Sequence, residues 1–452
     1  MSSLKQYIDL AAVHRAAVDA GSPAALNAAR AEAFARLSAP GARLPEKGDE
    51  GYEKTSVEEM FAPDYGLNVN RLDIPVDLAA SLNCGGVPHT STLLAVTAND
   101  VFHPTATLAE RLPEGVAFCS MREAATRFPD ILAQYYATAA KGATADLNTL
   151  LAQDGVFIHV ADNVHAAKPL QLVNIFSSPS GEPLMGVRRV LIVAGRNASL
   201  QLLVCDHTQD ETTRYLSSEV TEIFALEGAK VEYVNVEESS ALSSRMSDLH
   251  IVQEARSEVR VNYATLTCGT TRNNLTVDLR GEHASCQLCG MAVASKTMHI
   301  DNDTNVRHLT ANCHSNQLFR YVVDDHAVGA FEGSILVADG ARFTEAYQSN
   351  KNIVAAPTAT MHTKPQLEIY NDDVKCSHGA STGQLDRNAL FYMATRGIPE
   401  NEARTMLMQA FMVDVINEIT IEGLAERMRH LTELRFSEDP AQLCATCRQT
   451  PS

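Results

Sequence analysis

Short β-strand patterns recur through the middle of this chain at a nearly fixed interval, and that interval restricts the fold more than any other feature. Five segments between residues 185 and 375 share a small residue, a polar spacer and alternating apolar positions. The small residues are Ala198, Ala229, Ser257, Ala284 and Ala327. Their spacings are 31 (229 − 198), 28 (257 − 229), 27 (284 − 257) and 43 (327 − 284). The last spacing is long enough to contain an extra half-turn or an arm.

A period of 27 to 31 residues without intervening helices predicts a β-solenoid, in which each coil hydrogen-bonds to the next. Inward side chains then form a continuous apolar ladder, and small residues recur where the chain turns a corner. An antiparallel sandwich is the alternative, because it also consists of short alternating strands. Sandwich strands usually recur every ~8–12 residues and do not require aligned small residues, so we predict the solenoid.

Helical patterns flank the repeats and divide the chain into three predicted regions. Residues 1–150 are expected to form helices and an extended connector rich in Pro, Gly and charge. Residues 151–385 form the predicted core, where Val156, Ile158 and Val160 begin the strand alternation. Residues 386–452 are expected to be helical, with Pro399 in the first turn of the middle helix.

The charge and the termini limit the partners and the compartment. The chain has 452 residues, a formal net charge of −18 and a pI of about 5.3. A surface this acidic repels phosphate backbones, so nucleic acid is not an expected partner. The N-terminus shows no signal-peptide pattern, and no apolar run approaches the ~20 residues of a membrane helix. We therefore expect a cytoplasmic chain without membrane attachment, whose ten cysteines are mostly reduced thiols.

Common catalytic motifs are missing. The sequence has no G-x-x-x-x-G-K-[ST] phosphate loop, so no nucleotide is expected to bind this chain, and no G-x-G-x-x-G or G-x-S-x-G motif. Cys286 and Cys289 lie in a predicted strand, where positions three apart face opposite sides, and are interpreted as packing residues. Cys444 and Cys447 have ligand spacing without a second pair nearby, and the sequence does not define their role.

A dense group of potential metal ligands lies near residue 300, and we interpret it as the polar corners of coils. Its members are His299, Asp301, Asp303, His308, Cys313 and His314.

The stretch LEIYNDDVKCSHGAS, residues 367–381, places Cys376 and His378 two positions apart beside a glycine. If the strand continues through them, both side chains lie on the same side, ~7 Å apart at Cα. A thiolate and an imidazole at that spacing could both bind iron or zinc. They could equally be a nucleophile with its base, or a buried cysteine beside a corner histidine, and the two residues alone do not decide.

The predicted middle helix of the C-terminal region is apolar on more than one face, through residues that include Met406, Leu407, Ala410, Phe411 and Val415. One apolar stripe is sufficient for packing on a single neighbour. The helix is therefore either buried within its own bundle or uses a second apolar face to dock a partner.

The tract KPQLEIYNDDVKCSHGASTGQLDRNALFYMATRGIPENEARTMLMQAF, residues 364–411, closely resembles the C-terminal signature of the SufB/SufD family of SUF iron–sulfur cluster assembly scaffolds. The resemblance covers residues 150–420 well, through segments such as LNTLLAQDGVFIHVADNV and VRHLTANCHSNQLFRYVVDDHAVGAFEGSILV. The sequence CSHGAS is similar to the SufD form, whereas the SufB form carries glutamates around the histidine. GYEKTSVEEM resembles the N-terminal connector of the family but lacks its common tryptophan.

The resemblance implies a mainly β fold, a right-handed parallel β-helix flanked by N-terminal and C-terminal α-helical regions. It implies a non-catalytic scaffold subunit that pairs with SufB and docks the ATPase SufC through Met406, Leu407, Ala410, Phe411 and Val415. His378 maps to the histidine implicated in building a transient cluster at the interface with SufB. Cys376 occupies the position where SufB carries a thiol. Whether the isolated chain forms a homodimer through the same edge is left open.

Two other functions also stay open at this point. A SufB-type main scaffold would share the fold and hold a cluster without help. A β-helix carbohydrate-active enzyme would need paired carboxylates or a Ca²⁺ site, for which Asp372 and Asp373 are the candidates near His378. The sequence does not define the cluster type, the iron and electron donors, or the stoichiometry.

Overall fold

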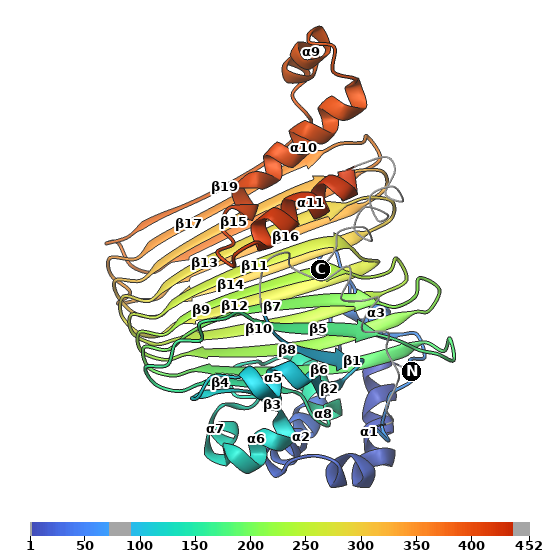
Figure 1. Cartoon of the computed structure of the whole chain (residues 1–452), viewed down its shortest axis with the longest axis vertical. Helices are drawn as coiled ribbons and strands as arrows, with labels where there is room; N and C mark the ends of the chain where they lie inside the picture. The colour runs from blue at the N-terminus through green and yellow to red at the C-terminus, as the bar shows by residue number, and fades with distance from the viewer. Residues whose placement is uncertain (1, 72–91, 437–452) are drawn as a thin grey trace.

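Figure 1 shows the computed structural model, which describes residues 2–71 and 92–436. Its main body is a parallel β-solenoid of about seven turns, with helices at the N- and C-terminal ends. The mainly β fold with flanking helices is therefore confirmed. Cys444 and Cys447 lie outside the described residues.

The coils form two facing sheets. In spatial order, the ten-stranded sheet contains β19 (Lys375–Gly383), β17 (Glu345–Val354), β15 (His314–Val323), β13 (Ser285–Ala294), β11 (Glu258–Thr267), β9 (Lys230–Glu238), β7 (Ser199–Thr208), β5 (Leu170–Phe176), β1 (Leu93–Ala98) and β2 (Val101–Pro104). The nine-stranded sheet contains β18 (Thr360–Ile369), β16 (Val328–Val337), β14 (His299–His308), β12 (Thr270–Leu279), β10 (Ser244–Gln253), β8 (Tyr215–Ala225), β6 (Leu184–Ala194), β4 (Val156–Val160) and β3 (Val116–Ser120). From β4 onward, the chain alternates between the sheets at every corner.

Successive coils pair in parallel and in register. The β17–β19 pairing runs from Glu345 opposite Lys375 to Ile353 opposite Gly383, and β16 pairs with β18 in the same way. Antiparallel pairing joins only β1 to β2 and β3 to β4 among the described strands. The parallel registers exclude the antiparallel sandwich.

The small residues that define the sequence repeat lie at the corners and are fully buried. The first four each precede a strand of the ten-stranded sheet, whereas Ala327 precedes β16 of the other sheet. Cys313 occupies the equivalent corner before β15, 29 residues after Ala284 (313 − 284). The spacing of 43 is therefore one coil of 29 residues and a half coil of 14 (327 − 313), which confirms the extra half-turn.

Alternate residues of each strand face inward and form one apolar core, which includes Val190 and Ile192 from β6 and Leu202 and Val204 from β7. The outer face of the ten-stranded sheet is covered by α10 (Glu400–Ile416) and α11 (Leu424–Phe436), which share a second apolar cluster with that sheet. The preceding helix α9 (Arg387–Thr395) buries no residue and extends beyond the last strands (Figure 1).

Helices from the N-terminal region cover the outer face of the nine-stranded sheet at its early strands. They are α1 (Ser3–Ala20), α2 (Ala24–Leu37), α3 (Val57–Phe61), α6 (Met121–Arg127), α7 (Pro129–Tyr135) and α8 (Ala143–Leu151). A short helix, α5 (Ala106–Arg111), lies against β1.

The prediction of helix and loop for residues 1–150 was incomplete, because β1, β2 and β3 also lie in this region. Leu93 of β1 pairs with Leu170 of β5, and a pairing this distant in sequence leaves no local period. Residues 120–140 carry apolar residues at the spacing of one helix, but they contain two, α6 and α7, because Pro129 disfavours a helical conformation at Phe128. The boundary predicted at residue 385 lies between Gly383, which ends β19, and Arg387, which begins α9.

Charged residues also occupy inward positions. The Arg188 guanidinium lies 3.0 Å from Asp206, and Arg245 lies 3.2 Å from Glu219 and 3.7 Å from Glu237. Burial raises the pKa of Glu219 and of Glu237. Although burial acts in the same sense on Asp206, the two arginines hold its pKa below the ordinary value. Because each arginine reaches carboxylates on other strands, this network links the strands of neighbouring coils through the core.

Close packing at the corners predicts the effect of a single methyl group. A Cβ added at Gly281 would lie 1.9 Å from the backbone nitrogen of Ala255 on the preceding coil, so Gly281→Ala must displace backbone. We expect a loss of about 1–3 kcal/mol or more of unfolding free energy, seen as a lower thermal unfolding midpoint. Gly383→Ala is the control, because nothing lies within 4 Å of the Cβ it adds. Equal midpoints for the two variants would contradict the corner geometry.

Candidate functional site

The solenoid ends in two strands that each have a single strand neighbour. β19 lies beside β17 and β18 beside β16, at the ends of their sheets. We call this pair of strands the last rung. Within the described ranges no strand pairs with the outer edge of β18 or of β19. A free strand edge offers backbone N–H and C=O groups for pairing with another chain.

Cys376 and His378 both lie on β19, in the row of inward-facing residues. Cys376 is the register neighbour of the buried Ala346 and packs in the same cluster. Since strand residues alternate between faces, His378 faces inward as well, above its register neighbour Gln348. No further coil follows in the described chain, so the His378 side chain is exposed while Cys376 is half-buried. The structure therefore brings both predicted residues to one face of the last rung.

The environment favours the neutral thiol of Cys376. Burial raises the pKa of this thiol, while the backbone of Ala346 acts weakly in the opposite direction. A bound metal ion reverses this balance, because a coordinating thiol is deprotonated by the charge of the ion. Cys376 and His378 together offer two ligands, whereas each iron of a common cluster binds several sulfur or nitrogen ligands. In the part of the chain that the structure describes, no group of three or more His, Cys, Asp or Glu side chains is arranged for a metal ion.

The dense group near residue 300 forms structural contacts. On the outer face of β14, Asp301 and Asp303 lie 2.8 and 2.6 Å from the buried Arg272 guanidinium. Thr55 Oγ1 donates to Asp301 at 2.5 Å and lies 2.9 Å from His299 Nε2. These contacts hold the N-terminal connector against the nine-stranded sheet.

The remaining members of that group are dispersed. His308 is buried with its Nε2 2.8 Å from Ser315 Oγ, and Cys313 is at a coil corner. Cys286 belongs to the inner core, whereas Cys289 belongs to the cluster beneath the C-terminal helices, so the two thiols face opposite sides as predicted.

The residues predicted to dock a partner are divided between two faces of α10. Val415 is buried against the ten-stranded sheet, and Leu407 and Phe411 are half-buried in the same cluster. Met406 and Ala410 are exposed. The helix thus uses one apolar face within the chain and leaves the other in solvent.

Two aromatic residues of α9 extend the exposed apolar surface. Phe391 is 72% exposed, Tyr392 58% and Met406 45%. We call these three residues the α9–α10 patch. Phe391 and Tyr392 lie on α9, which extends past the last rung (Figure 1), and Met406 lies on α10.

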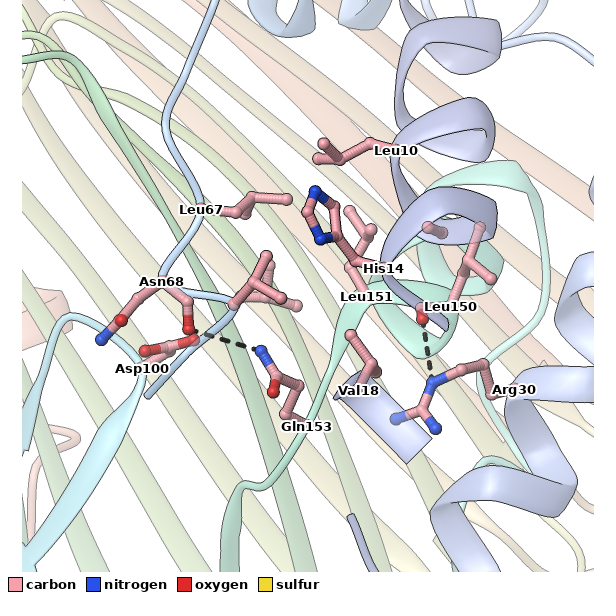
Figure 2. A pocket seen from close by; sticks show the side chains of 13 residues that line it. Leu10, His14, Val18, Arg30, Leu67, Asn68, Asp100, Leu150, Leu151 and Gln153 are labelled. Carbon is pink, nitrogen blue, oxygen red and sulfur yellow. Dashed lines mark hydrogen bonds between the residues drawn. The ribbon is translucent and has the colours of Figure 1, made fainter. Parts of the chain in front are cut away.

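A small hollow in the N-terminal layer is remote from the last rung. Figure 2 shows it between α1, α8 and the segment around Asn68, with Leu10 and Val18 among its apolar lining. Gln153 donates to the Asn68 carbonyl at 3.4 Å, and Arg30 donates to the Leu150 carbonyl at 3.1 Å. The first bond joins the segment after α8 to the segment around Asn68, and the second joins α2 to α8, so the hollow belongs to the packing of the N-terminal layer.

Comparison with models of protein families identifies the family of this chain. The model of the SufBD core domain of SUF system FeS cluster assembly matches residues 176–411, and the model of the SufBD N-terminal region matches residues 1–172. The chain belongs to the SufBD family. It is accordingly an iron–sulfur cluster assembly protein of the SUF system.

Individual relatives agree with this assignment at modest identity. The chain is 29% identical over 290 residues to the iron–sulfur cluster assembly protein SufD of Escherichia coli, covering 62% of this chain and 67% of that protein. It is 24% identical over 327 residues to SufD of Bacillus subtilis, covering 71% and 74%. A SufBD family protein of Synechocystis is 27% identical over 404 residues, covering 87% and 88%. None of the helices in the described ranges combines the length and apolar character needed to cross a membrane.

The burial pattern predicts the order in which thiols react. Of the described cysteines, only Cys376 is not fully buried. In the native chain, iodoacetamide should therefore modify Cys376 first among them, as measured by mass spectrometry of the digested protein. The reaction should be slow at neutral pH and accelerate above the ordinary thiol pKa of 9.0, because the thiolate is the nucleophile and burial raises this pKa. Equally fast modification of Cys286 would contradict the assignment.

Proposed function

We propose that this chain is the SufD-type subunit of a cytoplasmic SUF scaffold, which pairs with SufB, docks the ATPase SufC and binds no nucleotide itself. One observation carries the proposal: His378 lies in the inward row of a last rung whose end is open. An imidazole inside a complete solenoid is sealed in the core, whereas this one faces an incoming subunit. The names of the SufD relatives support the same role.

Pairing with SufB uses the free edges of β18 and β19. A sister subunit of the same fold has two matching edges, so backbone hydrogen bonds extend both sheets across the interface. The same edges allow a homodimer when the chain is isolated. Pairing covers the last rung and places His378 between the two solenoids.

The cargo of this interface is a transient iron–sulfur cluster. His378 contributes an imidazole nitrogen and Cys376 is the second candidate ligand, and both donor types suit iron. SufB supplies the remaining ligands. The imidazole must be neutral to bind iron, so low pH is expected to weaken assembly. The chain performs no bond-breaking chemistry and serves to hold and release the cluster.

The C-terminal helices provide a mechanical link between SufC and the cluster site. The Arg404 guanidinium on α10 donates to the carbonyl of Ala355 at 2.9 Å, directly after β17. Arg320 on β15 lies 3.5 Å from Asp414 on the same helix. β17 is the neighbour of β19, so a displacement of α10 by SufC shifts the strand that supports His378.

Replacing His378 tests the cluster site. His378→Ala should leave the complex with SufB and SufC intact but lower the yield of reconstituted cluster on the order of tenfold or more, because one ligand is lost. Cluster yield is measured from visible absorption and iron content of the purified complex.

Ser377→Ala is the matched control, since Ser377 is exposed on the opposite face of the same strand. A normal yield from His378→Ala would refute the role. A cluster held by the isolated chain at full occupancy would instead favour the SufB-type main scaffold.

Introducing negative charge into the exposed apolar surface tests SufC docking. The double variant Phe391→Asp/Tyr392→Asp removes two exposed aromatic residues of the α9–α10 patch, and aromatic anchors commonly contribute about 2 kcal/mol or more each. Capture of SufC in a pull-down should fall at least about thirtyfold while SufB pairing persists. Val13→Asp, at a position on α1 that is 79% exposed, is the control. Undiminished capture by the double variant would place the dock elsewhere.

A further inference from the structure

A glutamine lies directly beneath the proposed cluster ligand. Gln348 on β17 is the register neighbour of His378 on β19, and its side chain is only 4% exposed. The amide reaches across the core to Gly333 of the opposite sheet, where an added Cβ would lie 2.1 Å from Gln348 Nε2. Gly333 therefore provides the space that this amide occupies.

Gln348 is unusual among its polar neighbours. Neither its Nε2 nor its Oε1 has a hydrogen-bond partner among the described residues. By contrast, the buried Asn350 two positions along β17 accepts from Asn352 at 2.7 Å and from Thr363 at 2.8 Å. Leaving a polar group unpaired in the core is costly, so a fully unpaired amide requires an explanation.

The next coil down provides a comparison. Gln317 on β15 is the register neighbour of Gln348 and is completely buried. Its Oε1 accepts a hydrogen bond from Thr304 at 2.6 Å, and only its Nε2 is unpaired. The free acceptor oxygen of this row is thus found at Gln348, directly beneath the imidazole.

We infer that Gln348 is a positioning residue for His378, an inference that rests on the proposed function. Neighbouring coils are ~4.8 Å apart, so rotation of either side chain brings Gln348 Oε1 within hydrogen-bonding reach of a ring nitrogen. The amide oxygen accepts the N–H of the inner ring nitrogen of His378. The outer ring nitrogen then has its lone pair directed toward the interface, where iron arrives.

The chemistry of the amide suits this task. A histidine that binds a metal almost always donates its other ring N–H to an acceptor, which fixes the tautomer and the orientation of the ring. Gln348 provides a neutral acceptor, so it adds no uncompensated charge to the core beneath the last rung. The pairing of the two subunits orders the His378 ring and thereby supplies the partner that the buried amide lacks.

The test uses the cluster-free complex with SufB and titrates it with Co²⁺, followed by visible absorption. Gln348→Leu removes the acceptor at similar volume and should weaken Co²⁺ binding about 10–100-fold, as loss of an outer partner of a ligand does. Gln348→Glu keeps an acceptor oxygen at the same place and should bind Co²⁺ within about threefold of the unsubstituted complex. Gln317→Leu removes the same side chain one coil deeper and should also bind normally.

Three results would overturn the inference. They are normal Co²⁺ affinity for Gln348→Leu, equal weakening by Gln317→Leu, and equal weakening by Gln348→Glu.

If Gln348→Leu does not assemble with SufB, Gln348→Met replaces it, because methionine has the same length and lacks the carbonyl oxygen. The His378→Ala complex is titrated in parallel. If His378→Ala loses Co²⁺ binding but Gln348→Leu binds Co²⁺ normally, the inference about Gln348 is refuted and the proposed function stands. Normal binding by His378→Ala refutes the proposed function itself.

Discussion

The structure depends on the parallel, in-register hydrogen bonding of each coil to the next. This pairing carries every row of side chains along the solenoid at a spacing of ~4.8 Å, so a residue's neighbours are set by its register. Inward charges must then be neutralised by neighbours on the same sheet or across the core, as Arg188 of β6 and Asp206 of β7 are at 3.0 Å. The position of His378 follows from the same rule, because its row has been inward-facing since the first coils.

Register also explains which features could be predicted from the sequence. The buried corner residues must be small in every coil, so their spacing revealed the solenoid and even the half coil before Ala327. The opposite orientations of Cys286 and Cys289 needed only the two-residue period of a strand. Cys376 and His378 were placed on one face by the same argument.

Other features have no local signal. β1 joins the ten-stranded sheet by pairing with β5, and the residues that decide this pairing are far apart in the sequence. A polar residue in a strand pattern is expected to face water, so neither the buried Arg245 nor Gln348 was identified as part of the interior. The distribution of α10 residues between a buried and an exposed face likewise depends on where the helix packs, which its composition does not specify.

The two ends of the solenoid differ, and the difference limits how many subunits can associate. The antiparallel strands β2 and β3 terminate the sheets at one end, near the N-terminal helices (Figure 1), while at the other end no described strand pairs with the outer edges of β18 and β19. A solenoid open at both ends could add copies indefinitely and grow into a filament. An isologous association through β18 and β19, in which each chain uses the same end, would join two chains and then close.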